Sequence, residues 1–171
     1  LPTLKSREST TLTHQKKTGA TFVHPSNDIN VILGNATAVW EMAKKVEHLD
    51  VVIAPVGGGG LICGVGTYIK YLRPEVKIIG VESEGAASMW AALDAGKRVK
   101  LDPDELDQFA DGTATLQVGK ENFKLAKDCV DEVIRVNTDE ICAAIKDIFD
   151  NIRSIPYLIF IYMNYLSLKK L

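Results

Sequence analysis

The chain has few cysteines and histidines, and it has no excess of charge of either sign. Its 171 residues contain 3 cysteines and 3 histidines, whose spacing matches no common zinc motif, so we predict no metal site. The odd number of cysteines favours free thiols in a reducing compartment over a disulfide framework. The formal net charge of −2 provides no broad cationic surface, so nucleic acid is not expected as a partner.

Long apolar runs are also missing. The most apolar segment, from Ile155 to Leu168, is interrupted by Pro156 and Asn164, and it is shorter than the roughly twenty residues that a membrane-spanning helix needs. We therefore expect no membrane partner. With 46% apolar and 25% charged residues, the composition is that of an ordinary globular domain with one core.

Four consecutive glycines, Gly57 to Gly60, separate two apolar segments of different periodicity. The β-branched run at 51–54 predicts a buried strand, and the apolar spacing over 61–72 predicts a helix. Glycine lets a ligand approach the main chain closely, and a helix N-terminus offers unpaired N–H groups to an anion. The run therefore predicts a phosphate-binding loop. A tight turn that serves only the packing of helix on sheet is the alternative.

The residues of the loop rule out a P-loop and do not match the dinucleotide-binding fingerprint. In a P-loop, Lys and a hydroxyl residue would stand where this chain has Val65 and Gly66. The fingerprint Gly-x-Gly-x-x-Gly is not matched, because Ile62 and Cys63 occupy the two possible positions of its third glycine. Glu82 lies about twenty residues beyond the loop, as the ribose-binding acid of that fingerprint does. A nicotinamide-binding domain therefore stays open as an alternative.

Alternating periodicities organise the rest of the chain. Helices are predicted at 37–46, 61–72, 86–95, 119–129 and 139–149, the last with Thr138 as N-cap, and strands at 51–54, 76–81 and 132–136. This order predicts an α/β fold with a mainly parallel twisted sheet and helical crossovers. Residues 1–20 show no helical apolar stripe, and we expect a divergent or disordered segment there.

Four stretches resemble threonine dehydratase (threonine ammonia-lyase) of the isoleucine-biosynthetic type. They are Val56–Leu61 (VGGGGL), Lys77–Glu82 (KIIGVE), Phe109–Thr113 (FADGT) and Val136–Phe149 (VNTDEICAAIKDIF). The resemblance covers residues 21–155 and implies part of the catalytic domain of a fold-type II pyridoxal-phosphate enzyme, related to the tryptophan synthase β fold. The glycine loop alone is shared with serine racemase and other relatives.

The resemblance implies a cofactor, a reaction and a place for the cofactor's phosphate. The cofactor is pyridoxal 5′-phosphate, whose phosphate the main-chain amides of Gly57, Gly58, Gly59, Gly60 and Leu61 are expected to bind. The parent enzyme is expected to convert L-threonine, and L-serine less well, into a 2-oxo acid and ammonia, and to form a homo-oligomer. The resemblance leaves the compartment open: cytoplasm, or mitochondrion or plastid in a eukaryote.

Other positions near the loop carry weaker signals. Cys63 lies in the first turn of the predicted helix, where a helix N-terminus lowers the pKa of an accessible thiol, but we favour core packing for it. The resemblance makes Gly112 a secondary candidate near the cofactor ring. Serine racemase has a divalent-cation ligand where this chain has Ser88, so no such metal site is expected.

The family's cofactor-linking lysine lies in a motif, Ser-Phe/Tyr-Lys-x-Arg-Gly, that does not occur in these 171 residues. No catalytic residue is therefore nominated, and this chain is expected to be inactive alone. Residues 156–171 depart from the family's Glu-Pro-x-Gly-Ala-Leu continuation and form a divergent apolar tail. Two alternatives remain: a member of the fold like serine racemase or serine dehydratase, and a nonenzymatic phosphate- or nucleotide-binding module.

Overall fold

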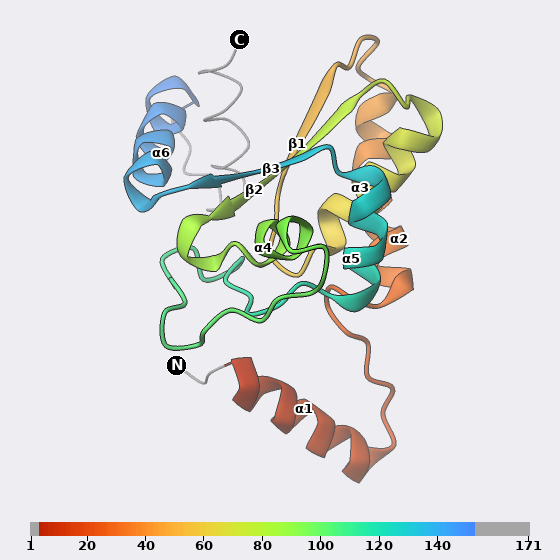
Figure 1. Cartoon of the computed structure of the whole chain (residues 1–171). Helices are drawn as coiled ribbons and strands as arrows, with labels where there is room; N and C mark the ends of the chain where they lie inside the picture. The colour runs from red at the N-terminus through yellow and green to blue at the C-terminus, as the bar shows by residue number, and fades with distance from the viewer. Residues whose placement is uncertain (1–3, 153–171) are drawn as a thin grey trace.

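Short β-branched runs form a three-stranded parallel sheet in the computed structural model, which describes residues 4–152 (Figure 1). In chain order the elements are α1 (Leu4–Thr18), α2 (Ile29–Ala43), β1 (Val51–Pro55), α3 (Gly60–Leu72), β2 (Lys77–Ser83), the 3₁₀ turn Glu84–Ala86, α4 (Ser88–Asp94), α5 (Lys120–Cys129), β3 (Glu132–Val136) and α6 (Thr138–Ile152). The strand order is β1-β2-β3, and both pairings are parallel. The predicted α/β class with helical crossovers is confirmed.

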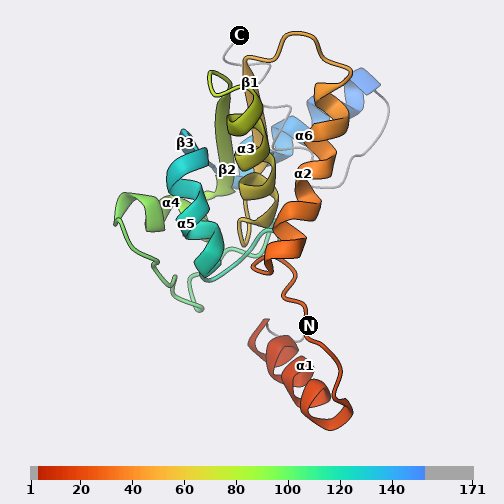
Figure 2. The same ribbon diagram turned by 90° about the vertical axis from the view of Figure 1, so that its right-hand side faces the viewer.

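Helices cover both faces of this sheet. Val52 pairs with Ile78, and both side chains belong to the larger core, which α3 and α5 share with the sheet. Val81 pairs with Ile134 and faces the smaller core, to which α6 contributes. Helix α2 packs on α3, as Figure 2 shows. The carboxyl ends of parallel strands lie at the same end of a sheet, so the loops after β1 and β2 lie there together.

Helix α2 begins eight residues earlier than the sequence predicted. Its N-cap is Asp28, whose Oδ1 accepts a hydrogen bond of 2.8 Å from the N–H of Asn30. Gly34 interrupts the helical periodicity of the first turns, which are nevertheless held in place because Ile32 is buried against α3. Packing therefore overrides weak local propensity here.

The predicted N-cap of the last helix is wrong by one residue. The Oδ1 of Asn137 accepts a hydrogen bond from the N–H of Glu140, and the Glu140 carboxylate accepts one from the N–H of Asn137, both at 3.0 Å. This reciprocal pair is a capping box, which needs an acidic residue three positions after the cap. Thr138 has Ile141 at that position and cannot form a capping box. The N-cap is therefore Asn137, one residue before the predicted cap.

Residues 4–18 form helix α1, although the sequence shows no helical apolar stripe there. Gly19 ends the helix in the left-handed conformation (φ 71°), and its N–H donates to the carbonyl of Gln15 at 2.9 Å. Figure 1 shows α1 set apart from the sheet and its helices. The tail at 156–171 lies outside the described residues. Between residues 4 and 152, no helix is both long enough and apolar enough to cross a membrane.

Two glycines provide a matched test of the α2–α3 packing. A methyl group on Gly64 would collide with the carbonyl oxygen of Ile32, a backbone atom of α2, whereas a methyl group on Gly34 would meet nothing within 4 Å. Gly64→Ala should therefore destabilise the fold by about 1–3 kcal/mol. Gly34→Ala should stabilise it by about 0.5–1 kcal/mol, because alanine favours a helix interior.

Denaturant unfolding of both variants and the parent chain would measure these changes. Equal free energies of unfolding for the two variants would contradict the close approach of the two helices.

Candidate functional site

The glycine loop joins the carboxyl end of β1 to the first turn of α3. Gly59 is the N-cap of α3 and has φ 95°, a left-handed conformation that glycine adopts without strain. The first helical hydrogen bond runs from the N–H of Cys63 to the carbonyl of Gly59 at 3.1 Å. The N–H groups of Gly60, Leu61 and Ile62 precede that bond and have no helical acceptor. The loop is therefore backed by the positive end of a helix dipole.

Neighbouring segments leave little space beside the first two glycines. A Cβ added to Gly57 would lie 3.1 Å from the Cα and carbonyl oxygen of Thr113, and one added to Gly58 would lie 2.7 Å from the Cβ of Ser26. Thr113 belongs to the Phe109–Thr113 stretch that the sequence singled out. The structure therefore brings that stretch onto the glycine loop.

The last two glycines are confined in the same way. A Cβ on Gly59 would lie 2.8 Å from the Cε of Met89, and one on Gly60 would lie 2.8 Å from the carbonyl oxygen of Ser26. Packing thus excludes a side chain at Gly58 and Gly60, the left-handed backbone favours glycine at Gly59, and Gly57 leaves little room, which supports the packing interpretation of the run. The N–H groups at the start of α3 are still available, so the packed loop also keeps the features of an anion site.

A buried asparagine connects the loop to a segment far away in the sequence. The Nδ2 of Asn122 donates to the carbonyl of Gly58 at 2.7 Å and to the carbonyl of Ser26 at 2.6 Å. The N–H of Gly119 also donates to the Gly58 carbonyl, at 3.1 Å. Sequence reasoning missed Asn122 and Ser26, because no local pattern marks a contact between residues 64 or 96 positions apart.

A cavity of about 720 Å³ adjoins the loop. Three cationic side chains line it, and Gly58 forms part of its wall. Other lining residues come from α1 (Thr11), from the segment before α2 and from the segment that leads into α5. The cationic residues are Arg98, Lys100 and Lys120. Their charge favours an anionic ligand beside the glycine loop.

Glu82 does not serve as a ribose-binding acid. Its side chain is 1% exposed, and its two carboxylate oxygens accept hydrogen bonds from the N–H groups of Met89 (2.9 Å) and Trp90 (2.8 Å). Both oxygens are therefore engaged within the protein. Burial raises the pKa of Glu82 to about 7, although these N–H bonds act in the opposite direction. The structure removes the observation that favoured a nicotinamide-binding domain.

Cys63 is a core residue, as the sequence analysis favoured. It is fully buried, and its Sγ lies 3.2 Å from the carbonyl oxygen of Asn122, to which it donates. A hydrogen bond with Cys129 and burial raise the pKa of the Cys63 thiol, so the helix N-terminus does not activate it. This thiol fixes α3 against α5 rather than facing a ligand.

The two other positions that the sequence analysis considered, Gly112 and Ser88, differ in their surroundings. Gly112 is exposed, and a Cβ on it would meet nothing within 4 Å, so its role near a cofactor ring stays a prediction. Ser88 is buried, with its Oγ 3.4 Å from the Oγ1 of Thr115. In the part of the chain from residue 4 to 152, no three His, Cys, Asp or Glu side chains gather as a metal site requires.

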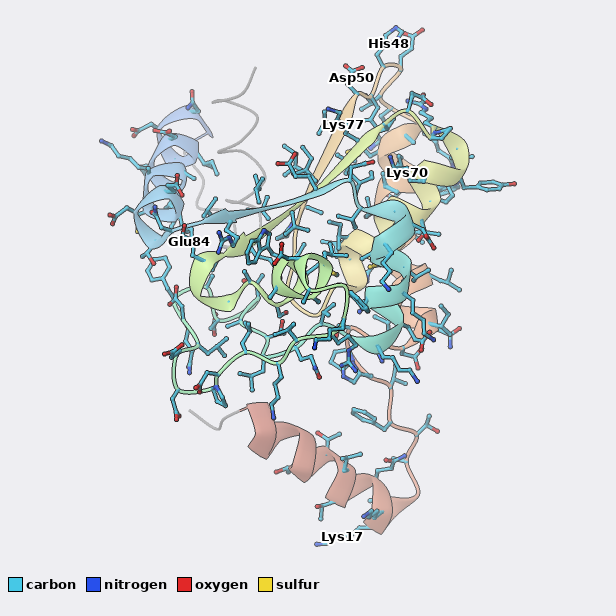
Figure 3. The ribbon with its side chains drawn as sticks, in the orientation of Figure 1. Lys17, His48, Asp50, Lys70, Lys77 and Glu84 are labelled. Atoms are coloured by element: carbon cyan, nitrogen blue, oxygen red, sulfur yellow. The ribbon has the colours of Figure 1, made fainter. Side chains whose placement is uncertain are left out.

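Lys70 on α3 and Lys77 on β2 lie away from the glycine loop. Figure 3 shows Lys70 and Lys77 near the edge where β1 and β2 begin, together with His48 and Asp50. Lys70 pairs with the Asp131 carboxylate at 2.8 Å. The loop instead follows the opposite, carboxyl end of β1. Lys70 thus connects α3 to Asp131, away from the glycine loop.

Known sequences resemble this chain over most of its length. The family described as pyridoxal-phosphate dependent enzyme matches residues 4–154. The biosynthetic L-threonine dehydratase of Burkholderia multivorans is 46% identical over 142 residues, which cover 82% of this chain and 28% of that protein. The chain thus spans little more than a quarter of the length of this curated relative.

Solved structures resemble the fold equally well. The processed form of threonine deaminase isoform 2 from Solanum lycopersicum matches with a TM-score of 0.90 and 39% identity, over 95% of this chain and 47% of that chain. Serine racemase from Dictyostelium discoideum matches with a TM-score of 0.85 and 34% identity, over 98% of this chain and 52% of that chain.

The buried carboxyl of Glu82 predicts a pH dependence of stability. Its pKa is about 7 in the folded chain against an ordinary value of 4.5, so between these values the folded state holds a proton that the unfolded state has lost. The free energy of unfolding should therefore fall as the pH rises through this window, by on the order of 3 kcal/mol. Denaturant unfolding at a series of pH values measures the slope.

Glu82→Gln should abolish most of this slope, whereas Glu84→Gln, at an exposed neighbouring position, should leave it in place. A slope of the same size in the Glu82→Gln variant would show that another group is responsible.

Proposed function

This chain belongs to the pyridoxal-phosphate dependent enzyme family, and from that membership we propose that it forms the phosphate-binding part of a threonine ammonia-lyase. Its similarity to biosynthetic threonine dehydratase confirms the resemblance drawn from the sequence. The proposed reaction of the whole enzyme converts L-threonine into 2-oxobutanoate and ammonia, as a step of isoleucine biosynthesis. L-Serine is the proposed poorer substrate, and a homo-oligomer is the proposed assembly.

The observation that carries the proposal is the glycine loop at the start of α3. Main-chain N–H groups from Gly57 to Leu61 would hold the cofactor's phosphate, supported by the helix dipole. Gly60 and Leu61 lie in the first turn, before the first helical hydrogen bond, so their N–H groups have no helical acceptor. The chemistry of this donor set fits a phosphate, because it offers several hydrogen bonds without a counter-charge on a side chain.

These residues bind and orient the cofactor in the proposed enzyme. Pyridoxal phosphate, when bound, supplies an electron-accepting ring that stabilises negative charge on the α-carbon of an amino acid. The loop would fix the phosphate end of the cofactor, and the backbone of Thr113, packed on Gly57, would limit how the loop moves. A fixed phosphate in turn positions the ring relative to the substrate.

Two other candidate functions have support of their own. The cationic cavity beside Gly58 favours a nonenzymatic module that binds a phosphate or a nucleotide. The likeness to the serine racemase of Dictyostelium discoideum supports a racemase or a serine dehydratase. Threonine ammonia-lyase is preferred because of the higher identity to the threonine dehydratase over most of this chain.

The phosphate should dominate the affinity of the 171-residue chain for vitamin B6 compounds. Pyridoxine 5′-phosphate carries no aldehyde and so forms no adducts with lysines. We expect it to bind at least about tenfold more tightly than pyridoxine, which corresponds to about 1.4 kcal/mol. Inorganic phosphate should compete with it. Isothermal titration calorimetry measures both affinities.

Gly58→Val should abolish this preference, because its side chain would collide with Ser26, and Gly34→Ala is the matched control outside the loop. Circular dichroism would verify that each variant folds. Equal affinities of the parent chain for the two compounds would refute phosphate recognition by the loop.

The chain alone should not consume L-threonine. The family's motif with the cofactor-linking lysine does not occur in these 171 residues, so no residue is available to remove the α-proton. Formation of 2-oxobutanoate in the presence of pyridoxal phosphate should equal that in a reaction without protein. Turnover at an enzyme-like rate would contradict this expectation and would require a lysine of this chain as the base.

A further inference from the structure

The geometry points to Asn122 as a positioning residue that sets the direction of the Gly59 N–H in the glycine loop. This inference rests on the proposed function in one respect only, the identity of the ligand that the N–H would meet. The contacts of Asn122 and the conformation of the loop belong to the protein itself. They join three segments that are distant in the sequence, namely 26–27, 57–60 and 119–122.

Asn122 is held between two backbone carbonyl groups. It lies in the first turn of α5, whose N-cap is Gly119, and its side chain is completely buried. The amide nitrogen lies 2.7 Å from the Gly58 carbonyl and 2.6 Å from the Ser26 carbonyl. Because both partners are acceptors, the nitrogen must be the atom that faces them. The side chain therefore gives both of its N–H hydrogens to carbonyl groups.

The oxygen of the same side-chain amide is in a different situation. The Oδ1 of Asn122 is buried and has no hydrogen-bond partner among the residues that the structure describes. A buried acceptor without a partner is unfavourable. The side chain thus keeps an orientation that satisfies the two carbonyls at the expense of its own oxygen. This orientation therefore holds the glycine loop and the Ser26 segment together.

The direction of the Gly58 carbonyl determines the direction of the Gly59 N–H, which belongs to the same peptide group. The described chain contains no cis peptide bonds, and in a trans peptide the C=O and N–H groups point in opposite directions. The Gly58 carbonyl points toward Asn122 and the Gly119 N–H, which donates to it at 3.1 Å. The Gly59 N–H therefore points away from α5. Its orientation is fixed as long as these two donors hold the carbonyl.

The peptide group between Gly58 and Gly59 needs a side chain from another segment to hold it. Gly58 and Gly59 have no Cβ to restrict their backbone, and glycine explores more conformations than other residues. Neighbouring atoms confine the space around Gly59: an added Cβ would lie 3.0 Å from the Cβ of Asn122. Asn122 thus restricts the peptide both by contact and by hydrogen bonding. An oriented N–H binds an anion without reorganising, which favours affinity.

The experiment compares two variants of the 171-residue chain, Asn122→Leu and Asn122→Asp. Leucine has a similar shape but no donor, and aspartate places a carboxylate against two carbonyl oxygens. In the ligand-free chain, both variants should shift the amide resonances of Gly58, Gly59 and Gly60. Loss of one hydrogen bond should speed hydrogen exchange at the Gly119 amide about tenfold. Ile141→Val, in the other core, is the matched control and should leave these signals unchanged.

The ligand arm uses pyridoxine 5′-phosphate and pyridoxine. Asn122→Leu should weaken binding of the phosphate compound about tenfold, the effect of one hydrogen bond, and should leave binding of pyridoxine unchanged. Burial raises the pKa of an aspartate carboxyl. As the pH falls, the introduced carboxyl is protonated and regains a donor. The affinity of Asn122→Asp relative to the parent chain should then recover. Pyridoxine separates this role from a purely structural one, because general destabilisation of the fold would weaken the binding of both compounds.

Separate results overturn this inference and the proposed function. If Asn122→Leu leaves the Gly59 resonance and the Gly119 exchange rate unchanged, Asn122 does not position the loop. If the parent chain binds both compounds equally, the proposed phosphate recognition fails. In that case the resonance and exchange measurements in the ligand-free chain still decide the role of Asn122.

Discussion

The carbonyl group of Gly58 is the point at which three separate segments of the chain meet. It accepts hydrogen bonds from the side chain of Asn122 and from the N–H of Gly119, and the same asparagine holds Ser26. This junction is possible because the loop has no side chains to keep its neighbours away. The start of α3, the entry to α2 and the first turn of α5 therefore depend on one another.

A second buried polar group supports the loop from another direction. Glu82, near the end of β2, binds the N–H groups of Met89 and Trp90 and so fixes α4 to the sheet. Met89 then closes the space beside Gly59. Buried polar groups are favourable when their hydrogen bonds are made. The two side chains thus convert a flexible glycine run into a loop with a defined conformation, which is what an anion site requires.

Local patterns were sufficient to predict the elements that form the centre of the fold. The β-branched run at 132–136 and the apolar spacing over 61–72 identified β3 and α3 to within one residue. The start of α2 was missed because Gly34 weakens its periodicity, while the burial of Ile32 against α3 holds the helix. The N-cap at Asn137 was missed because only its pairing with Glu140 identifies it.

The site was predictable in part for the same reason. The glycine run itself is a local signal, and the family resemblance gave it a ligand. Asn122 and Ser26 carry no local signal, because their roles arise only when the fold brings them to Gly58. The burial of Glu82 was equally hidden: its position in the sequence suggested contact with a ribose, and the structure shows both carboxylate oxygens bound to α4.

The central claim is that the main chain of the glycine loop, rather than the cationic side chains of the adjoining cavity, recognises phosphate. The most direct test is a titration of the ¹⁵N-labelled chain with inorganic phosphate, followed residue by residue in its amide resonances. The account predicts saturable shifts centred on Gly57 to Leu61. Shifts centred on Arg98, Lys100 and Lys120, with the loop amides unmoved, would contradict it.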